Sequence, residues 1–141
     1  MQDIRRTFPS LNRRNCKKKS PDDFNYNCLA FVLGDRANWW EPPGEFGFYW
    51  PPGFSPDLKV ETVTAIIKLH GFVMELEPNA IPFADSVAIY AKGGEWEHFA
   101  KFTDGTWTSK IGEDHDIAHS SLKLLEGDLY GKVVKILSRA K

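Results

Sequence analysis

The second half of the chain shows short runs in which hydrophobic and polar positions alternate, a pattern typical of β-strands. Between these runs lie glycine-containing turns, and no internal repeat is evident. Strands are therefore expected over residues 72–76, 86–91, 96–103, 106–110 and 132–137. A brief helix capped by Ser120 or Ser121 is expected to run as far as Glu126.

Asp104-Gly105 predicts a two-residue type I′ hairpin turn between two of these strands. Such a turn fixes the register, because Thr103 must then pair with Thr106 and each further pair follows from it. His98 is paired with Ile111 on this register. Alternate side chains share a face, and one face is predicted to carry His98, Ala100, Phe102, Trp107 and Ser109.

Two helices are predicted before the strands. The first lies within residues 22–34, with Asn25 as its N-cap and Gly34 as its terminator. The second begins at Ser55-Pro56 and carries an apolar stripe as far as His70. Two N-terminal helices packed on an antiparallel meander constitute an α+β fold.

Residues 35–56 join the two helices and are rich in proline, glycine and aromatic residues. Proline excludes regular helix and central strand here, whereas the rings suggest an ordered loop. A long ordered loop is often functional. We expect this loop either to form one wall of a substrate cleft or to place its rings in the core.

The length of 141 residues fits one domain with its own core. No apolar run is long enough to cross a bilayer, and residues 1–6 lack the apolar region of a signal peptide. Two cysteines, Cys16 and Cys28, do not suggest a disulfide framework. The protein is therefore expected in the cytoplasm, or as one domain of a larger secreted protein.

Charge is distributed unevenly along the chain. Residues 1–20 hold seven bases and one acid, whereas the whole chain has a net charge of −1. Residues 1–21 are therefore predicted to be a basic lead-in or linker, and residues 22–141 the folded domain. The basic arm could contact an acidic partner.

Cys28 is the candidate nucleophile, because the N-terminus of a helix favours the thiolate. The alternative is that Cys28 is a small buried hydrophobic residue. A nucleophilic cysteine needs a base, and His98 lies on a strand that could direct its ring. Ser109 is a diagonal neighbour of His98 in the predicted register and could orient that ring.

Several blocks of the sequence resemble the papain-like NlpC/P60 superfamily, and in particular an uncharacterised bacterial branch of it. The first block is Tyr26-Asn27-Cys28-Leu29-Ala30, followed by Trp39-Trp40. The later blocks are His98-Phe99-Ala100, Asp104-Gly105, Trp107-Thr108-Ser109-Lys110-Ile111-Gly112, Asp116-Ile117 and His119. The similarity covers residues 22–137.

The resemblance implies a papain-like α+β fold and a cysteine-dependent hydrolase or acyl-transfer enzyme that acts on an amide bond. Its substrate would be a peptide, a protein or peptidoglycan, and no cofactor or metal would be needed. An effector or toxin domain would fit this class. Relatives usually carry His, Asn or Gln near Ser109, so Asp114 or Asp116 could supply the third catalytic group instead.

Two other classes of function compete with the hydrolase. His115 and His119 are four residues apart and could bind a metal ion on one face of a helix. The third class is a binding module whose papain-like cleft has no catalytic activity. The unusual Ser109 and the aromatic loop are compatible with this class.

Overall fold

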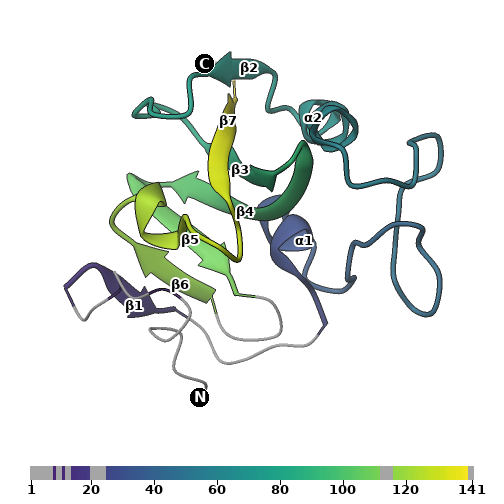
Figure 1. Ribbon diagram of the computed structural model, residues 1–141, viewed down its shortest axis with the longest axis horizontal. Helices are drawn as coiled ribbons and strands as arrows, with labels where there is room; N and C mark the ends of the chain where they lie inside the picture. The colour runs from purple at the N-terminus through teal and green to yellow at the C-terminus, as the bar shows by residue number, and fades with distance from the viewer. Residues whose placement is uncertain (1–7, 9–10, 12–13, 20–24, 112–115, 140–141) are drawn as a thin grey trace.

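The computed structural model describes residues 8, 11, 14–19, 25–111 and 116–139. Its main feature is an antiparallel sheet of seven strands (Figure 1). In sheet order these are β1 (Cys16–Lys18), β6 (Asp116–His119), β5 (Thr106–Lys110), β4 (Glu95–Thr103), β3 (Ser86–Lys92), β7 (Lys132–Ser138) and β2 (Met74–Leu76).

Among the residues that the structure describes, three short helices pack on this sheet. They are α1 (Cys28–Val32), α2 (Val60–Leu69) and the 3-10 helix η2 (Leu122–Leu125). No helix in the described part of the chain is long and apolar enough to cross a membrane.

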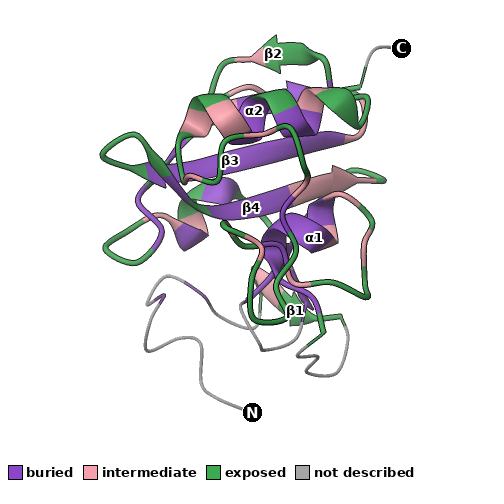
Figure 2. Ribbon diagram, turned by 90° about the vertical axis from the view of Figure 1, so that its right-hand side faces the viewer, coloured by how far each residue is buried: buried purple, intermediate pink, exposed green. Residues whose placement is uncertain are grey.

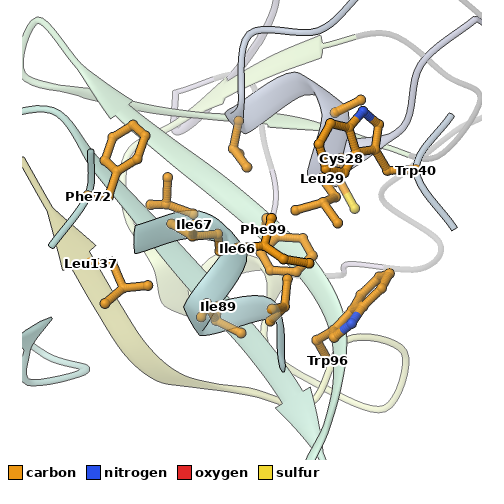
Figure 3. Packing of buried hydrophobic residues seen from close by; sticks show 14 of the residues in the cluster. Cys28, Leu29, Trp40, Ile66, Ile67, Phe72, Ile89, Trp96, Phe99 and Leu137 are labelled. Atoms are coloured by element: carbon orange, nitrogen blue, oxygen red, sulfur yellow. The ribbon is translucent and has the colours of Figure 1, made fainter. Parts of the chain in front are cut away.

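The sheet is covered on both faces, and each face has its own apolar core. Helices α1 and α2 cover one face, where Ile89, Phe99 and Leu137 of the sheet pack against Ile66 and Ile67 (Figure 3). The other face includes Tyr90, Ala100 and Ile136 and is covered by η2 and by Phe8 and Leu11. Strand β3 is consequently buried over most of its length, and β4 is buried from His98 to Ala100 (Figure 2).

The predicted hairpin is confirmed. Asp104 and Gly105 both have positive φ angles, 53° and 78°, as a type I′ turn requires. Thr103 pairs with Thr106, Phe102 with Trp107 and Ala100 with Ser109. The pairing of His98 with Ile111 is wrong, because β5 ends at Lys110.

The predicted helix starts are displaced in both cases. The N-cap of α1 is Asn27, whose side-chain oxygen accepts the N–H of Ala30, so Cys28 is the first helical residue. The end of α1 was predicted correctly, because Gly34 adopts φ +82° and donates its N–H to the carbonyl of Phe31. Helix α2 begins at Val60, four residues after Pro56.

The predicted papain-like α+β fold, with N-terminal helices on a meander, is wrong. The sheet dominates the molecule, and the two α-helices contain only 5 and 10 residues. The prediction missed the strands β1 and β6, which pair with each other. Residues 16–18 were placed in a basic lead-in ending at residue 21, but they form β1, so the folded unit begins before residue 22.

Candidate functional site

Cys28 lies at the start of α1 on the helix-covered face of the sheet. Its side chain belongs to the apolar cluster there, beside Leu29 and Trp40, and the residue is 8% exposed (Figure 3). The side chain of Asn27 ties the first turn to the following loop, because Oδ1 accepts the N–H of Trp40 at 3.1 Å and Nδ2 donates to the carbonyl of Trp40 at 2.7 Å. The position of the sulfur is therefore well defined and enclosed.

The pKa of the Cys28 thiol is raised to about 11, because burial disfavours the thiolate. Hydrogen bonds from the backbone N–H groups of Phe99, Leu29 and Cys28 itself lower it, as does the charge of Lys110. Burial outweighs these effects. The expected depressed pKa at the helix N-terminus is thus wrong, and Cys28 is a protonated thiol at neutral pH.

His98 lies on the opposite face of the sheet from Cys28. It pairs with Tyr90, and its ring stacks on Tyr130 with centroids 4.0 Å apart, both within the second core. Its neighbour Phe99 points to the helix-covered face with Cys28. The structure therefore does not bring the predicted nucleophile and base together, because the sheet itself separates them.

The His98 ring is enclosed and not oriented by Ser109. Its Nε2 has no hydrogen-bond partner among the described residues, and the residue is 1% exposed. Burial holds the pKa of His98 well below its usual value, and the nearby His119 lowers it further. His98 and Ser109 do share a face, as predicted, but no hydrogen bond joins them.

The side chain of Ser109 forms a hydrogen bond with His119 instead. Its Oγ lies 2.8 Å from Nε2 of His119, and Nδ1 of that ring lies 3.0 Å from the carbonyl oxygen of Ser121. A carbonyl only accepts, so Nδ1 carries the proton and the serine hydroxyl donates to Nε2. Burial lowers the pKa of His119 to about 4, which keeps the ring neutral. Both ring nitrogens are therefore engaged.

Asp116, one candidate for the third catalytic group, lies on the face of α1 rather than beside His98. The hydroxyl of Tyr26 lies 3.3 Å from its Oδ2, and Arg36 lies 3.8 Å from the same oxygen. The Lys110 ammonium lies 5.0 Å from the centre of the Tyr26 ring. These polar groups lie on the same face as Cys28, and the sequence did not predict that Lys110 would be buried there.

The other predicted site residues, Asp114 and His115, lie outside the described residues. His119 of the proposed metal pair bonds to Ser109 and Ser121. Within the described ranges, no three His, Cys, Asp or Glu side chains are grouped as a metal site would require.

An open cleft of about 960 Å³ lies on the His119 face. Its walls come from the segment before and within β1, the loop 78–82, the β4–β5 hairpin and the stretch from β6 to η2. Phe102 and Trp107 contribute aromatic rings, whose centroids are 5.0 Å apart. No residue of the loop 35–56 lines this cleft, and two rings of that loop, Trp40 and Trp50, are buried in the core on the Cys28 face.

The charges that line the cleft are mainly positive. Arg14, Lys17 and Lys123 contribute three bases, and Glu126 is the one acid among the lining residues. Glu126 accepts the backbone N–H of Val133 at 2.9 Å, so this carboxylate holds the start of β7. The cleft thus combines apolar rings with basic side chains.

The structure is a sheet-dominated domain with an open, partly aromatic cleft. The family model of a domain of unknown function, DUF7689, matches residues 17–138, and the chain belongs to this family. No curated protein and no solved structure matches the chain. The match includes all of β6 and all of β1 except Cys16.

Proposed function

We propose that this protein is a binding module whose cleft on the His119 face takes a short acidic segment of a polypeptide. The observation that carries the proposal is the cleft itself, with Phe102 and Trp107 beside basic lining residues. Binding sites of this size join apolar surface to a few polar groups that orient the ligand. An apolar side chain of the ligand would contact the rings.

The charge of the lining supports an acidic ligand over a basic one. Lys17 and Lys123 are both exposed, so their ammonium groups can approach a carboxylate without the cost of burying an unpaired charge. His119 is held neutral and adds no charge. Across such a cleft, charge complementarity sets which ligands are accepted more than it sets the total affinity.

The test measures binding by isothermal titration calorimetry. The probe is an acetylated pentapeptide of two glutamates, one phenylalanine and two glutamates, compared with the same peptide built on lysine. The acidic peptide should bind and the basic one should not. Weakening by about fivefold or more is expected for Lys123→Glu, which places a repelling charge in the cleft.

Two matched variants serve as controls. Lys59→Glu makes the same charge change at an exposed residue outside the cleft, and it should leave the affinity within about twofold. Phe102→Ala removes a ring of the cleft, whereas Phe48→Ala removes an exposed ring elsewhere. Equal losses in the two members of either pair would refute the proposal.

A second candidate function is thiol-dependent amide hydrolysis at Cys28, the activity that the resemblance to the NlpC/P60 superfamily implies. Three backbone N–H groups and Lys110 act on the same sulfur, which favours this candidate. Burial of the thiol and its separation from His98 oppose it. The hydrolase therefore stays a prediction.

This second candidate is tested with fluorogenic peptidyl amides. Turnover that disappears in Cys28→Ala but persists in His98→Gln would support thiol chemistry without His98 as base. Loss of turnover in both variants, with the fold intact by circular dichroism, would restore the Cys28–His98 pair and contradict the placement of these residues on opposite faces.

A further inference from the structure

The aromatic loop, defined here as residues 39–49, presents large apolar side chains to solvent. Phe46 is 95% exposed, and Phe48 and Tyr49 are 40% and 38% exposed. The loop extends beyond α1 and α2, away from the sheet (Figure 1). Exposed apolar surface of this kind commonly marks an interaction site.

The backbone holds the loop in place while its rings stay exposed. Tyr49 donates its N–H to the carbonyl of Trp39 at 2.7 Å, and Glu41 donates its N–H to the carbonyl of Tyr49 at 2.9 Å. Trp40 is buried and donates its ring N–H to Asp35 at 2.8 Å. The fold already orders this loop, so a ligand that binds it would cause little further loss of conformational entropy.

The conformation of Phe46 is unusual for an exposed residue. Its φ angle is +57°, a region that non-glycine residues seldom occupy, and the nearby Gly44 and Gly47 also have positive φ angles. Backbone in such a region is strained, and strained residues concentrate at functional sites. The phenyl ring gains no burial in exchange.

The charged residues of the aromatic loop are acidic. Glu41 and Glu45 are exposed, and residues 37–58 contain no lysine or arginine. Oε1 of Glu41 accepts the ring N–H of Trp39 at 3.3 Å, which places the carboxylate beside that indole. The rings of Trp39 and Phe48 lie 6.3 Å apart. Aromatic faces beside carboxylates are suited to bind cationic side chains, arginine above all.

We propose that the aromatic loop docks a basic, arginine-containing segment of a partner polypeptide. Guanidinium groups would stack on Trp39 and Phe48 and bond to Glu41 and Glu45, while Phe46 would contact the partner's apolar atoms. This site is distinct from the basic cleft, since no residue of the loop lines it. It therefore goes beyond the proposed function and does not depend on it.

The test measures fluorescence anisotropy of a fluorescein-labelled hexa-arginine peptide at about 50 mM and about 300 mM salt. Binding is expected at low salt, weakening as salt screens the carboxylates. A hexalysine peptide should bind at least about threefold more weakly, because lysine lacks the planar group that stacks. Equal affinity for the two peptides would overturn the stacking contact.

Paired variants separate the loop from general attraction to an acidic protein. The double variant Glu41→Gln and Glu45→Gln should weaken binding about tenfold, and so should Phe46→Ala combined with Phe48→Ala. The control neutralises two exposed acids outside the loop, Glu77→Gln and Glu97→Gln, and should change the affinity less than twofold. Equal effects of the two charge variants would overturn the proposal.

Two further outcomes also decide the question. Self-association of the unliganded protein that is lost in the Phe46 and Phe48 variant would make a second copy the occupant and overturn the proposal. Preferential binding to vesicles of anionic lipid would do the same, since the loop carries acids and should be repelled by them.

Discussion

Protonation of His119 should destabilise the fold as the pH falls. The ring is 2% exposed, accepts from Ser109 and donates to Ser121, and its pKa is lowered to about 4 by burial. An unfolded histidine titrates near 6.5. Between these two values the unfolded chain binds more protons than the folded chain. Stability is therefore present above about pH 6.5 and is lost progressively as the pH falls towards 4.

The size of this effect follows from the two pKa values. Proton linkage at His119 should remove about 2 kcal/mol of unfolding free energy between about pH 7.5 and about pH 5. His98, whose pKa is also lowered, adds to the loss in the same direction. Most carboxylates remain ionised at about pH 5 and contribute less over this interval.

Urea denaturation at the two pH values measures the effect in the wild-type protein and in His119→Asn. The variant should be less stable at both pH values. Between them, however, its unfolding free energy should fall by about 2 kcal/mol less than that of the wild-type protein. Far-UV circular dichroism checks that the variant keeps the same fold. An unchanged pH dependence in His119→Asn would show that the ring is not held neutral in the folded protein.

Three further predictions concern stability and reactivity. Asn27→Ala removes a helix cap and leaves the buried N–H and carbonyl of Trp40 without their partner. Urea denaturation should therefore show that the unfolding free energy falls by about 2–4 kcal/mol. A fall of less than about 1 kcal/mol would contradict these contacts. Gly131→Ala should lower the melting temperature far more than Gly53→Ala, because a Cβ at residue 131 would overlap the Ala91 carbonyl and a Cβ at residue 53 would meet no neighbour. Equal shifts in melting temperature would contradict the close approach of Gly131 to Ala91. In a Cys16→Ser background, iodoacetamide should label Cys28 slowly at neutral pH. Fast labelling whose pH dependence has a midpoint below about pH 8.5 would show that the thiol is not buried and that its pKa is not raised.

The hairpin could be predicted from sequence because its determinants are local. Asp104 and Gly105 adopt positive φ angles, and the turn fixes the pairs nearest to it. The shared face of His98 and Ser109 followed from that register. The end of α1 at Gly34 is equally local, since a glycine at this position completes the helix terminus.

Strands β1 and β6 could not be predicted because each depends on distant partners. The segment 16–18 is short and basic, and it forms a strand only by pairing with β6. Asp116 and His119 are polar residues, but both are buried beside polar partners, Tyr26 and Ser109. Long-range pairing of this kind leaves little trace in local hydrophobicity.

The expectation that Cys28 and His98 lie close together was wrong for a similar reason. Alternation placed His98 on a face, but nothing in the hairpin indicates which face α1 covers. A register shift in the pairing of β3 with β4 places Trp96 on the helix-covered face together with Phe99, whereas His98, the neighbour of Phe99, lies on the other face. The interpretation of Cys28 as a small buried hydrophobic residue fits the structure better than the nucleophile does.

The proposed binding cleft is tested most directly by mapping where the acidic pentapeptide binds, by following backbone amide resonances in heteronuclear NMR. The largest shifts are expected on Phe102, Trp107 and the segment 118–123, with little change in α1. Shifts centred on Cys28 and α1 instead would place the ligand site on the opposite face of the sheet and contradict the binding cleft.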